Sequence, residues 1–200
     1  MAVAGPENKT PLTPEEETLL REQILPILRT TLPEGFVNRA LQAIKEAAEQ
    51  SKRKHGMGFG GLLPNSGQVG VSPLTPRDFN LATTWTLRSN WSSSSWQTLI
   101  SSQTTSKYTH MVVLAYEDLE PTPLALATKE TVGGQEHIII DLTEIHKSDR
   151  QIQPIEPYII APISVYTLEV FLSATGYDNF KPYGFTVAPY AYLVSKTFLS

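Results

Sequence analysis

Residues 157–198 form the most apolar and aromatic part of the chain and read PYIIAPISVYTLEVFLSATGYDNFKPYGFTVAPYAYLVSKTF. Between Val165 and Ala174 the even-numbered positions are apolar, whereas the odd-numbered positions include Thr167 and Glu169. Successive side chains of a strand point to opposite faces of a sheet, so this alternation predicts a strand with one buried face. The β-branched and aromatic residues of the stretch favour the same structure.

Further strand patterns occupy the chain between residue 79 and this stretch. Strands are predicted at residues 80–89, 108–116, 124–131 and 136–142, and a last one at 186–196. Residues 108–116 are apolar at most positions of both faces, which predicts a central strand. Gly133-Gly134 supplies the positive φ of a tight hairpin turn, and residues 143–157 are predicted to be a loop. We therefore expect residues 79–200 to form an antiparallel β-sandwich or jelly-roll-like body.

A helix begins just after the amino-terminal arm. Residues 1–12 hold little apolar surface and are predicted to be flexible. At the helix start, Thr13 is the expected N-cap, Pro14 the first helical residue and Glu16 the capping-box partner. We expect Pro26 to kink or shorten this helix, because proline cannot donate a backbone hydrogen bond.

Two apolar stripes at helical spacing predict a helical hairpin over residues 13–55. The first stripe consists of Leu20, Ile24 and Leu28, and the second of Val37, Leu41, Ile44 and Ala48. Both stripes are narrow, so the hairpin needs a surface to cover them: either the β body or a neighbouring subunit. Residues 56–78 are rich in Gly, Pro and Ser and are predicted to be a linker between the hairpin and the β domain.

Composition restricts the class of protein. The 200 residues carry a net charge of −4, so the chain has no overall positive field for nucleic acid. The absence of cysteine excludes disulfides and thiolate metal sites. The first residues lack the pattern of a signal peptide, and no apolar run approaches the roughly 20 residues that span a bilayer. We expect synthesis in the cytoplasm and no membrane span.

The sequence carries no motif that names a catalytic mechanism. None of the four histidines has metal-ligand spacing, and no G-x-S-x-G motif is present. Gly56, Gly58 and Gly61 match G-x-G-x-x-G, but a helix precedes them and Leu62-Leu63-Pro64 follows, which is the wrong context for a dinucleotide site. We therefore expect no enzyme, no cofactor and no metal.

One basic cluster is a candidate phosphate contact. It consists of Lys52, Arg53 and Lys54 at the end of the second predicted helix. The alternative is that these cations complement the negative end of the helix dipole. The sequence favours that alternative because it shows a single cluster with no interleaved aromatic residues, whereas single-strand binding sites combine the two.

Two sets of apolar residues are candidate partner contacts. The first is the stripe of Leu20, Ile24 and Leu28, and the second consists of the aromatic residues Trp91, Trp96, Tyr177, Phe180 and Tyr183. Aromatic residues are enriched in protein interfaces, but at the ends of a β-sandwich they also serve as core.

The layout of arm, helical hairpin, linker and β-sandwich resembles that of viral and phage shell and decoration proteins. That resemblance implies a structural subunit of a virion (capsid, minor capsid or decoration protein) that assembles through its arm and helices. Its partners would be copies of itself or other structural subunits, and nucleic acid is a weaker prospect. The alternative is a β-sandwich module that binds a carbohydrate or a protein through its loop aromatics.

Overall fold

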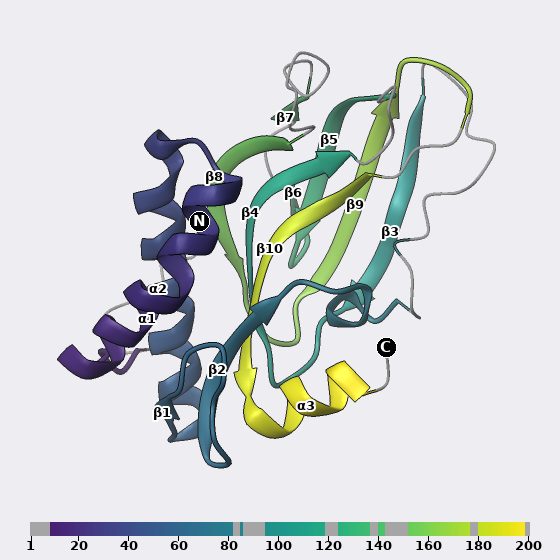
Figure 1. Ribbon diagram of the computed structural model, residues 1–200. Coiled ribbons are helices and arrows are strands. Elements are labelled where there is room, and N and C mark those ends of the chain that lie inside the picture. The colour runs from purple at the N-terminus through teal and green to yellow at the C-terminus, as the bar shows by residue number, and fades with distance from the viewer. Residues whose placement is uncertain are drawn as a thin grey trace.

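The computed structural model describes residues 9–81, 85, 95–118, 124–136, 140–142, 152–176 and 180–198, with only the backbone at 140 and 197–198. The protein is mainly β, with two amino-terminal helices and two sheets, as expected from the sequence. Figure 1 shows three layers: the two helices, a first sheet beside them and a second sheet on its far side.

The two helices follow the predicted pattern closely. Helix α1 (Pro14–Thr31) begins with the expected capping box, in which Thr13 and Glu16 bond each other's backbone N–H groups. Helix α2 (Glu34–His55) ends at Gly56, whose φ of 63° terminates it in the left-handed conformation. Pro26 lies inside α1 and does not shorten it, so of the two predicted effects, a kink or a shortening, the second is absent. Pro26 lies on the exposed side, where the carbonyl that loses its partner can face water.

The first sheet lies against the helices and has the order β1-β2-β10-β4-β8. Its strands are β1 (Gly58–Phe59), β2 (Gln68–Pro73), β4 (His110–Asp118), β8 (Ile152–Ile160) and β10 (Phe180–Pro189). All its pairings are antiparallel except that of β1 with β2. Strand β4 runs between β10 and β8 and is buried on both faces, which confirms the prediction of a central strand.

The second sheet has the order β3-β9-β5-β6, and β7 also pairs with β5. Its strands are β3 (Trp96–Thr104), β5 (Ala125–Val132), β6 (Gln135–Glu136), β7 (Ile140–Asp141) and β9 (Val165–Leu172). In β9 the residues Tyr166, Leu168, Val170 and Leu172 are buried, as the alternation predicted. The Gly133-Gly134 turn joins β5 to β6, with φ angles of 60° and 81°.

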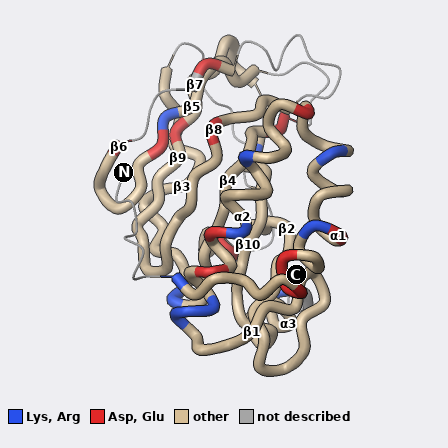
Figure 2. The backbone as a smooth tube through the Cα atoms, turned by 90° about the vertical axis from the view of Figure 1, so that its left-hand side faces the viewer, with Lys and Arg blue, Asp and Glu red and all other residues tan. Residues whose placement is uncertain are grey.

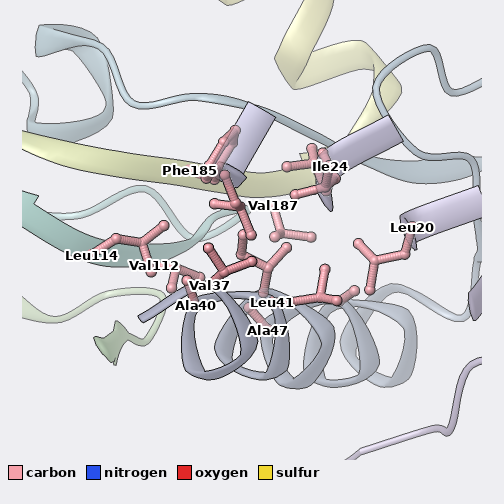
Figure 3. Packing of buried hydrophobic residues seen from close by; sticks show 14 of the residues in the cluster. Leu20, Ile24, Val37, Ala40, Leu41, Ala47, Val112, Leu114, Phe185 and Val187 are labelled. Atoms are coloured by element: carbon pink, nitrogen blue, oxygen red, sulfur yellow. The ribbon is translucent and has the colours of Figure 1, made fainter. Parts of the chain in front are cut away.

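The helical hairpin is covered by its own β body. Leu20, Ile24 and Leu28 are buried in one cluster with residues of α2 and of the first sheet. Figure 3 shows side chains of both helices meeting Val112, Phe185 and Val187 of β4 and β10. The expectation that Leu20, Ile24 and Leu28 contact a partner is therefore wrong: they are at most 2 % exposed in this chain. Hiding this apolar surface inside the chain leaves none of it for a second subunit.

A second core fills the space between the two sheets. Met111, Val113 and Phe180 contribute from the first sheet, and Leu168 and Val170 from the second. Because the first sheet is apolar on both faces, it holds the helices on one side and the second sheet on the other.

The segment 56–78 is not a linker, which corrects the sequence prediction. It supplies β1, β2 and the 3-10 turn Pro76–Phe79 to the folded body. The side-chain oxygen of Gln23 on α1 accepts a 2.7 Å hydrogen bond from the backbone of Leu62. At Gly70 a Cβ atom would lie 2.4 Å from Pro64, so the glycine allows close packing rather than flexibility.

Two further predictions fail in the second half of the chain, and one lies outside the described residues. The predicted loop over residues 143–157 overlaps β8, whose prolines suit an edge strand. The predicted last strand over 186–196 is instead the end of β10 followed by helix α3 (Tyr190–Phe198). The predicted strand over 80–89 falls mostly outside the described residues.

Candidate functional site

The structure separates the three residues of the predicted basic cluster. Lys52 is buried and forms an ion pair with Glu16, and its ammonium donates a 3.0 Å hydrogen bond to the carbonyl of Pro11. It is therefore a structural residue and not a phosphate contact, because its charge is already matched. Arg53 and Lys54 are exposed at the end of α2.

The candidate aromatic contacts are scattered. Trp91 and Tyr177 lie outside the described residues. Phe180 is fully buried between the sheets, stacked on Tyr116, so it is core rather than contact surface. Tyr183 is half-buried and packs edge-on against Phe185 on the helix side. Of the three candidates that the structure describes, Trp96 is the most exposed, at 37 %.

A tyrosine that the sequence reasoning did not select contacts the last turn of α2, which carries the exposed cations. Tyr108, in the turn between β3 and β4, is 44 % exposed. The Nε2 of His55, on α2, donates a hydrogen bond of 3.2 Å to the backbone carbonyl of Tyr108. The centres of the His55 and Tyr108 rings lie 6.3 Å apart. The hydrogen bond and the ring contact together hold the β3–β4 turn against the end of α2.

Two further groups complete this surface. The ammonium of Lys107 lies 5.0 Å from the centre of the Tyr108 ring, within cation–π range. The ring of Tyr192, on α3, lies 6.5 Å from the Tyr108 ring on another side. We call this surface the basic–aromatic end; it consists of Arg53, Lys54, His55, Lys107, Tyr108 and Tyr192.

The charges at the basic–aromatic end are not neutralised within the described part of the chain. Many other described cations have carboxylate partners, such as Lys129 with Glu169 and Lys181 with Glu117. Among the described residues no carboxylate lies within ion-pair distance of Arg53, Lys54 or Lys107. Elsewhere, Figure 2 shows basic and acidic segments interspersed over the tube, with neither sign covering a whole face.

A buried histidine behind this surface has a lowered pKa. His110 begins β4 just behind the surface, and burial lowers its pKa to about 4, with the charges of Lys54 and His55 acting in the same direction. Burial also lowers the pKa of His55, which its hydrogen bond to Tyr108 partly opposes. At neutral pH both rings are uncharged, so the positive charge of this surface comes from Arg53, Lys54 and Lys107.

A second polar group is enclosed between the sheets. Glu130 on β5 is fully buried, and burial raises its pKa to about 7, whereas the nearby Tyr158 hydroxyl acts in the opposite direction. The hydroxyls of Tyr158 and Tyr166 lie 3.3 Å apart, and burial raises the pKa of both. Sequence reasoning missed Glu130, although Thr128 and Glu130 are two apart and therefore share the inward face of β5.

A shallow cavity of about 230 Å³ lies on the outer side of the hairpin. Glu17 and Lys45 line it and form an ion pair with each other, so its charges are already matched. In the described ranges no three His, Asp or Glu side chains gather as metal ligands do. None of the described helices is long and apolar enough to cross a membrane.

The basic–aromatic end offers groups that can contact an anionic ligand. Three exposed cations can contact an anion with several negative charges, and the Tyr108 ring offers a flat apolar surface beside them. No protein-family model matches this chain, and no curated protein matches it by sequence.

Proposed function

We propose that this protein is a structural subunit of a multimeric assembly, in which copies join along the β3 edge of the second sheet. Strand β3 extends over nine residues, Trp96–Thr104, and contains no charged residue. Among the described strands it pairs only with β9 and therefore stands at the end of the second sheet, a position at which a strand of another chain can be added. This uncharged edge is the observation that carries the proposal.

The edge strand of the first sheet, β8, differs from β3 in its residues. Strand β8, at the edge of the first sheet, contains Pro154 and Pro157, and its exposed Glu156 forms an ion pair with Arg39. Proline and charge are devices that keep an edge strand from pairing with other chains. Strand β3 has neither.

The partner on this edge is a second copy of the same chain. Two uncharged strands can pair without like-charge repulsion. Trp96 lies at one end of β3 opposite Phe171, and Val165, which is 44 % exposed, lies opposite Thr104 at the other end. Register shifts after Thr98 and after Ile100 interrupt the pairing of β3 with β9. We therefore expect a short ladder reinforced by the side chains of Trp96 and Val165.

The setting that we propose for this multimer is a viral or phage coat, with the subunit as a shell or decoration protein. The support is the layout of two sheets packed against each other, which we propose to be a sandwich or jelly-roll-like body. This support is an analogy of fold and is weaker than the support for the multimer itself.

The multimer is tested by measuring mass in solution over a range of protein concentrations, by sedimentation velocity and mass photometry. We expect a species heavier than the 22.2 kDa chain whose fraction rises with concentration. The double variant Thr98→Lys/Ser101→Lys places two charges on exposed positions of β3 and should give the monomer.

A matched control separates the edge from general charge effects. Asn38→Lys/Gln42→Lys adds the same charge to exposed positions of α2 and should leave the multimer intact. A wild-type protein that is monomeric at all concentrations, or equal dissociation in both double variants, would contradict the proposal.

A second candidate function is a module that binds a carbohydrate or a protein through Trp96. The exposed Trp96 ring packs edge-on against Phe171 at 5.5 Å, and the Lys129 ammonium lies 5.8 Å from its centre. Aromatic rings held in this way can stack on a ligand. If the protein is a monomer that binds a glycan array and Trp96→Ala abolishes that binding, this candidate replaces the multimer.

A further inference from the structure

We propose that the basic–aromatic end binds single-stranded nucleic acid, with backbone phosphates contacting Arg53, Lys54 and Lys107 and a base stacking on Tyr108. This inference is independent of the multimer, because a single chain carries all of these residues.

Three chain segments far apart in sequence build this surface. Helix α2 supplies Arg53, Lys54 and His55, the β3–β4 turn supplies Lys107 and Tyr108, and α3 supplies Tyr192. The hydrogen bond from His55 to the Tyr108 carbonyl and the ring contacts of Tyr108 with His55 and Tyr192 hold the three segments together. The surface is therefore preformed, which reduces the entropy lost on binding.

The end of α2 carries more positive charge than its helix dipole accounts for once Lys107 is included. A helix carboxyl end attracts cations through its dipole, but this interaction extends only over the last turn. Lys107 belongs to a different segment and yet lies on the same surface, over the Tyr108 ring. A helix dipole explains Arg53 and Lys54, whereas it does not explain the third cation, so a polyanionic ligand accounts better for the set.

The combination of cations and an aromatic ring indicates the class of ligand. A sulfated sugar or an acidic peptide would need only the cations. The Tyr108 ring adds a flat surface next to them, and aromatic rings among cations are how proteins bind single strands without sequence preference. The bases of a duplex are stacked inside the helix and cannot reach the ring. We therefore expect a single strand to bind more tightly than a duplex.

The ammonium of Lys107 occupies one approach to the Tyr108 ring, where a base would stack. Its side chain is exposed, so it can swing outward when a base arrives and move its charge toward the adjacent phosphate. In the free protein Lys107 therefore covers the face of the Tyr108 ring on which a base would stack.

The experiment uses the full chain and a fluorescein-labelled 20-nucleotide oligo-dT, with binding measured by fluorescence anisotropy between 50 and 300 mM NaCl, concentrations of the order at which phosphate contacts change affinity strongly. The double variant Arg53→Ala/Lys54→Ala should weaken binding about tenfold or more at the lowest salt. It should also reduce the slope of log affinity against log salt by about 1.4, the value for two lost phosphate contacts on a single strand.

The matched control removes two charges from another surface. Arg21 and Arg29 are exposed on α1 and, among the described residues, lie within ion-pair distance of no carboxylate. Arg21→Ala/Arg29→Ala changes the net charge equally and should keep affinity within about twofold of wild type. Equal loss of affinity in the two double variants would overturn the proposal, because it would reduce the effect to net charge.

Two variants of Tyr108 test whether a base stacks on its ring. Tyr108→Phe keeps the ring and should bind normally, whereas Tyr108→Ala should lose about fivefold or more, the range for one stacked base. The proposal would be overturned if Tyr108→Ala bound as well as wild type. It would also be overturned if poly-glutamate displaced the labelled oligo-dT as readily as unlabelled oligo-dT does. Duplex DNA binding as tightly as the single strand would also overturn it.

The proposals of the multimer and of the nucleic-acid site can be refuted independently of each other. Thr98→Lys/Ser101→Lys, which is designed to disrupt the multimer, should retain binding of one oligo-dT per chain. A monomeric wild type that binds oligo-dT refutes only the multimer, and a multimer without oligo-dT binding refutes only this inference.

Discussion

The ammonium of Lys196 lies 2.6 Å from the carboxylate of Asp78, and both side chains are buried. The same ammonium donates hydrogen bonds to the hydroxyl of Ser72 and the carbonyl of Pro73, at 3.0 and 2.9 Å. Asp78 also accepts a 2.7 Å hydrogen bond from the backbone of Thr75. This network fastens α3 to the segment that follows β2 and so positions Tyr192 beside Tyr108.

Breaking this ion pair should destabilise the protein strongly. Lys196→Ala leaves the Asp78 carboxylate buried without its cation, which typically costs about 3–5 kcal/mol of unfolding free energy. The measurement is urea denaturation followed by circular dichroism. Lys181→Ala is the control, because Lys181 pairs with Glu117 in a partly exposed position and should cost about 1 kcal/mol or less. Similar costs for the two variants would show that the Lys196–Asp78 pair is not enclosed as described.

The pH dependence of stability should contain two opposing contributions. The pKa of Glu130 in the folded protein is raised from 4.5 to about 7, so between these pH values only the folded chain holds this proton. Stability therefore falls as pH rises through that window. The pKa of His110 is lowered from 6.5 to about 4, so there only the unfolded chain holds the proton, and stability rises with pH.

Variants separate the two contributions. In Glu130→Gln the His110 contribution remains, and the urea midpoint should rise between pH 4 and 6.5 more steeply than in wild type. In His110→Asn the Glu130 contribution remains, and the midpoint should fall between pH 4.5 and 7 relative to wild type. Parallel pH profiles in wild type and Glu130→Gln would contradict the burial of this carboxyl group.

The two faces of β9 should respond very differently to a charge. Leu168 is fully buried between the sheets, so Leu168→Asp places an unpaired charge in the core and should abolish cooperative unfolding. The neighbouring Thr167 points outward, so Thr167→Asp should shift the melting temperature only slightly. Thermal unfolding followed by circular dichroism compares the two, and a near-native melting temperature for Leu168→Asp would show that the strand faces are reversed.

Removing the helices should expose a large apolar face. Deletion of residues 1–55 uncovers Val69, Val112, Phe185 and Val187, all buried beneath the hairpin in the complete protein. We expect the truncated chain to aggregate or to bind the dye ANS strongly, in place of the independent β domain that the linker prediction implied. A soluble truncation with sharp unfolding would restore the two-domain interpretation.

Local patterns in the sequence predicted the elements that depend on neighbouring residues. The capping box of Thr13 and Glu16 and the Gly133-Gly134 turn are each decided within a few residues, and both are present. The inward face of β9 followed from alternation, because pleating fixes side-chain direction.

Other features depend on contacts between distant segments and were not visible in the sequence. Residues 56–78 look like a linker because glycines that permit close packing have the same composition as glycines that permit flexibility. The apolar run at 186–196 is too short for periodicity to separate a strand from a helix, and it proved to be the end of β10 and α3.

The sequence by itself determined that the chain is mainly β with two amino-terminal helices, because period and capping are local properties of the backbone. Only the tertiary structure decided what covers the apolar stripe of Leu20, Ile24 and Leu28, since any apolar surface would satisfy it equally well. Only the tertiary structure also placed Tyr108 beside His55, in the last turn of the helix that carries Arg53 and Lys54. Their proximity depends on the docking of α2 against β4, which no short-range pattern specifies.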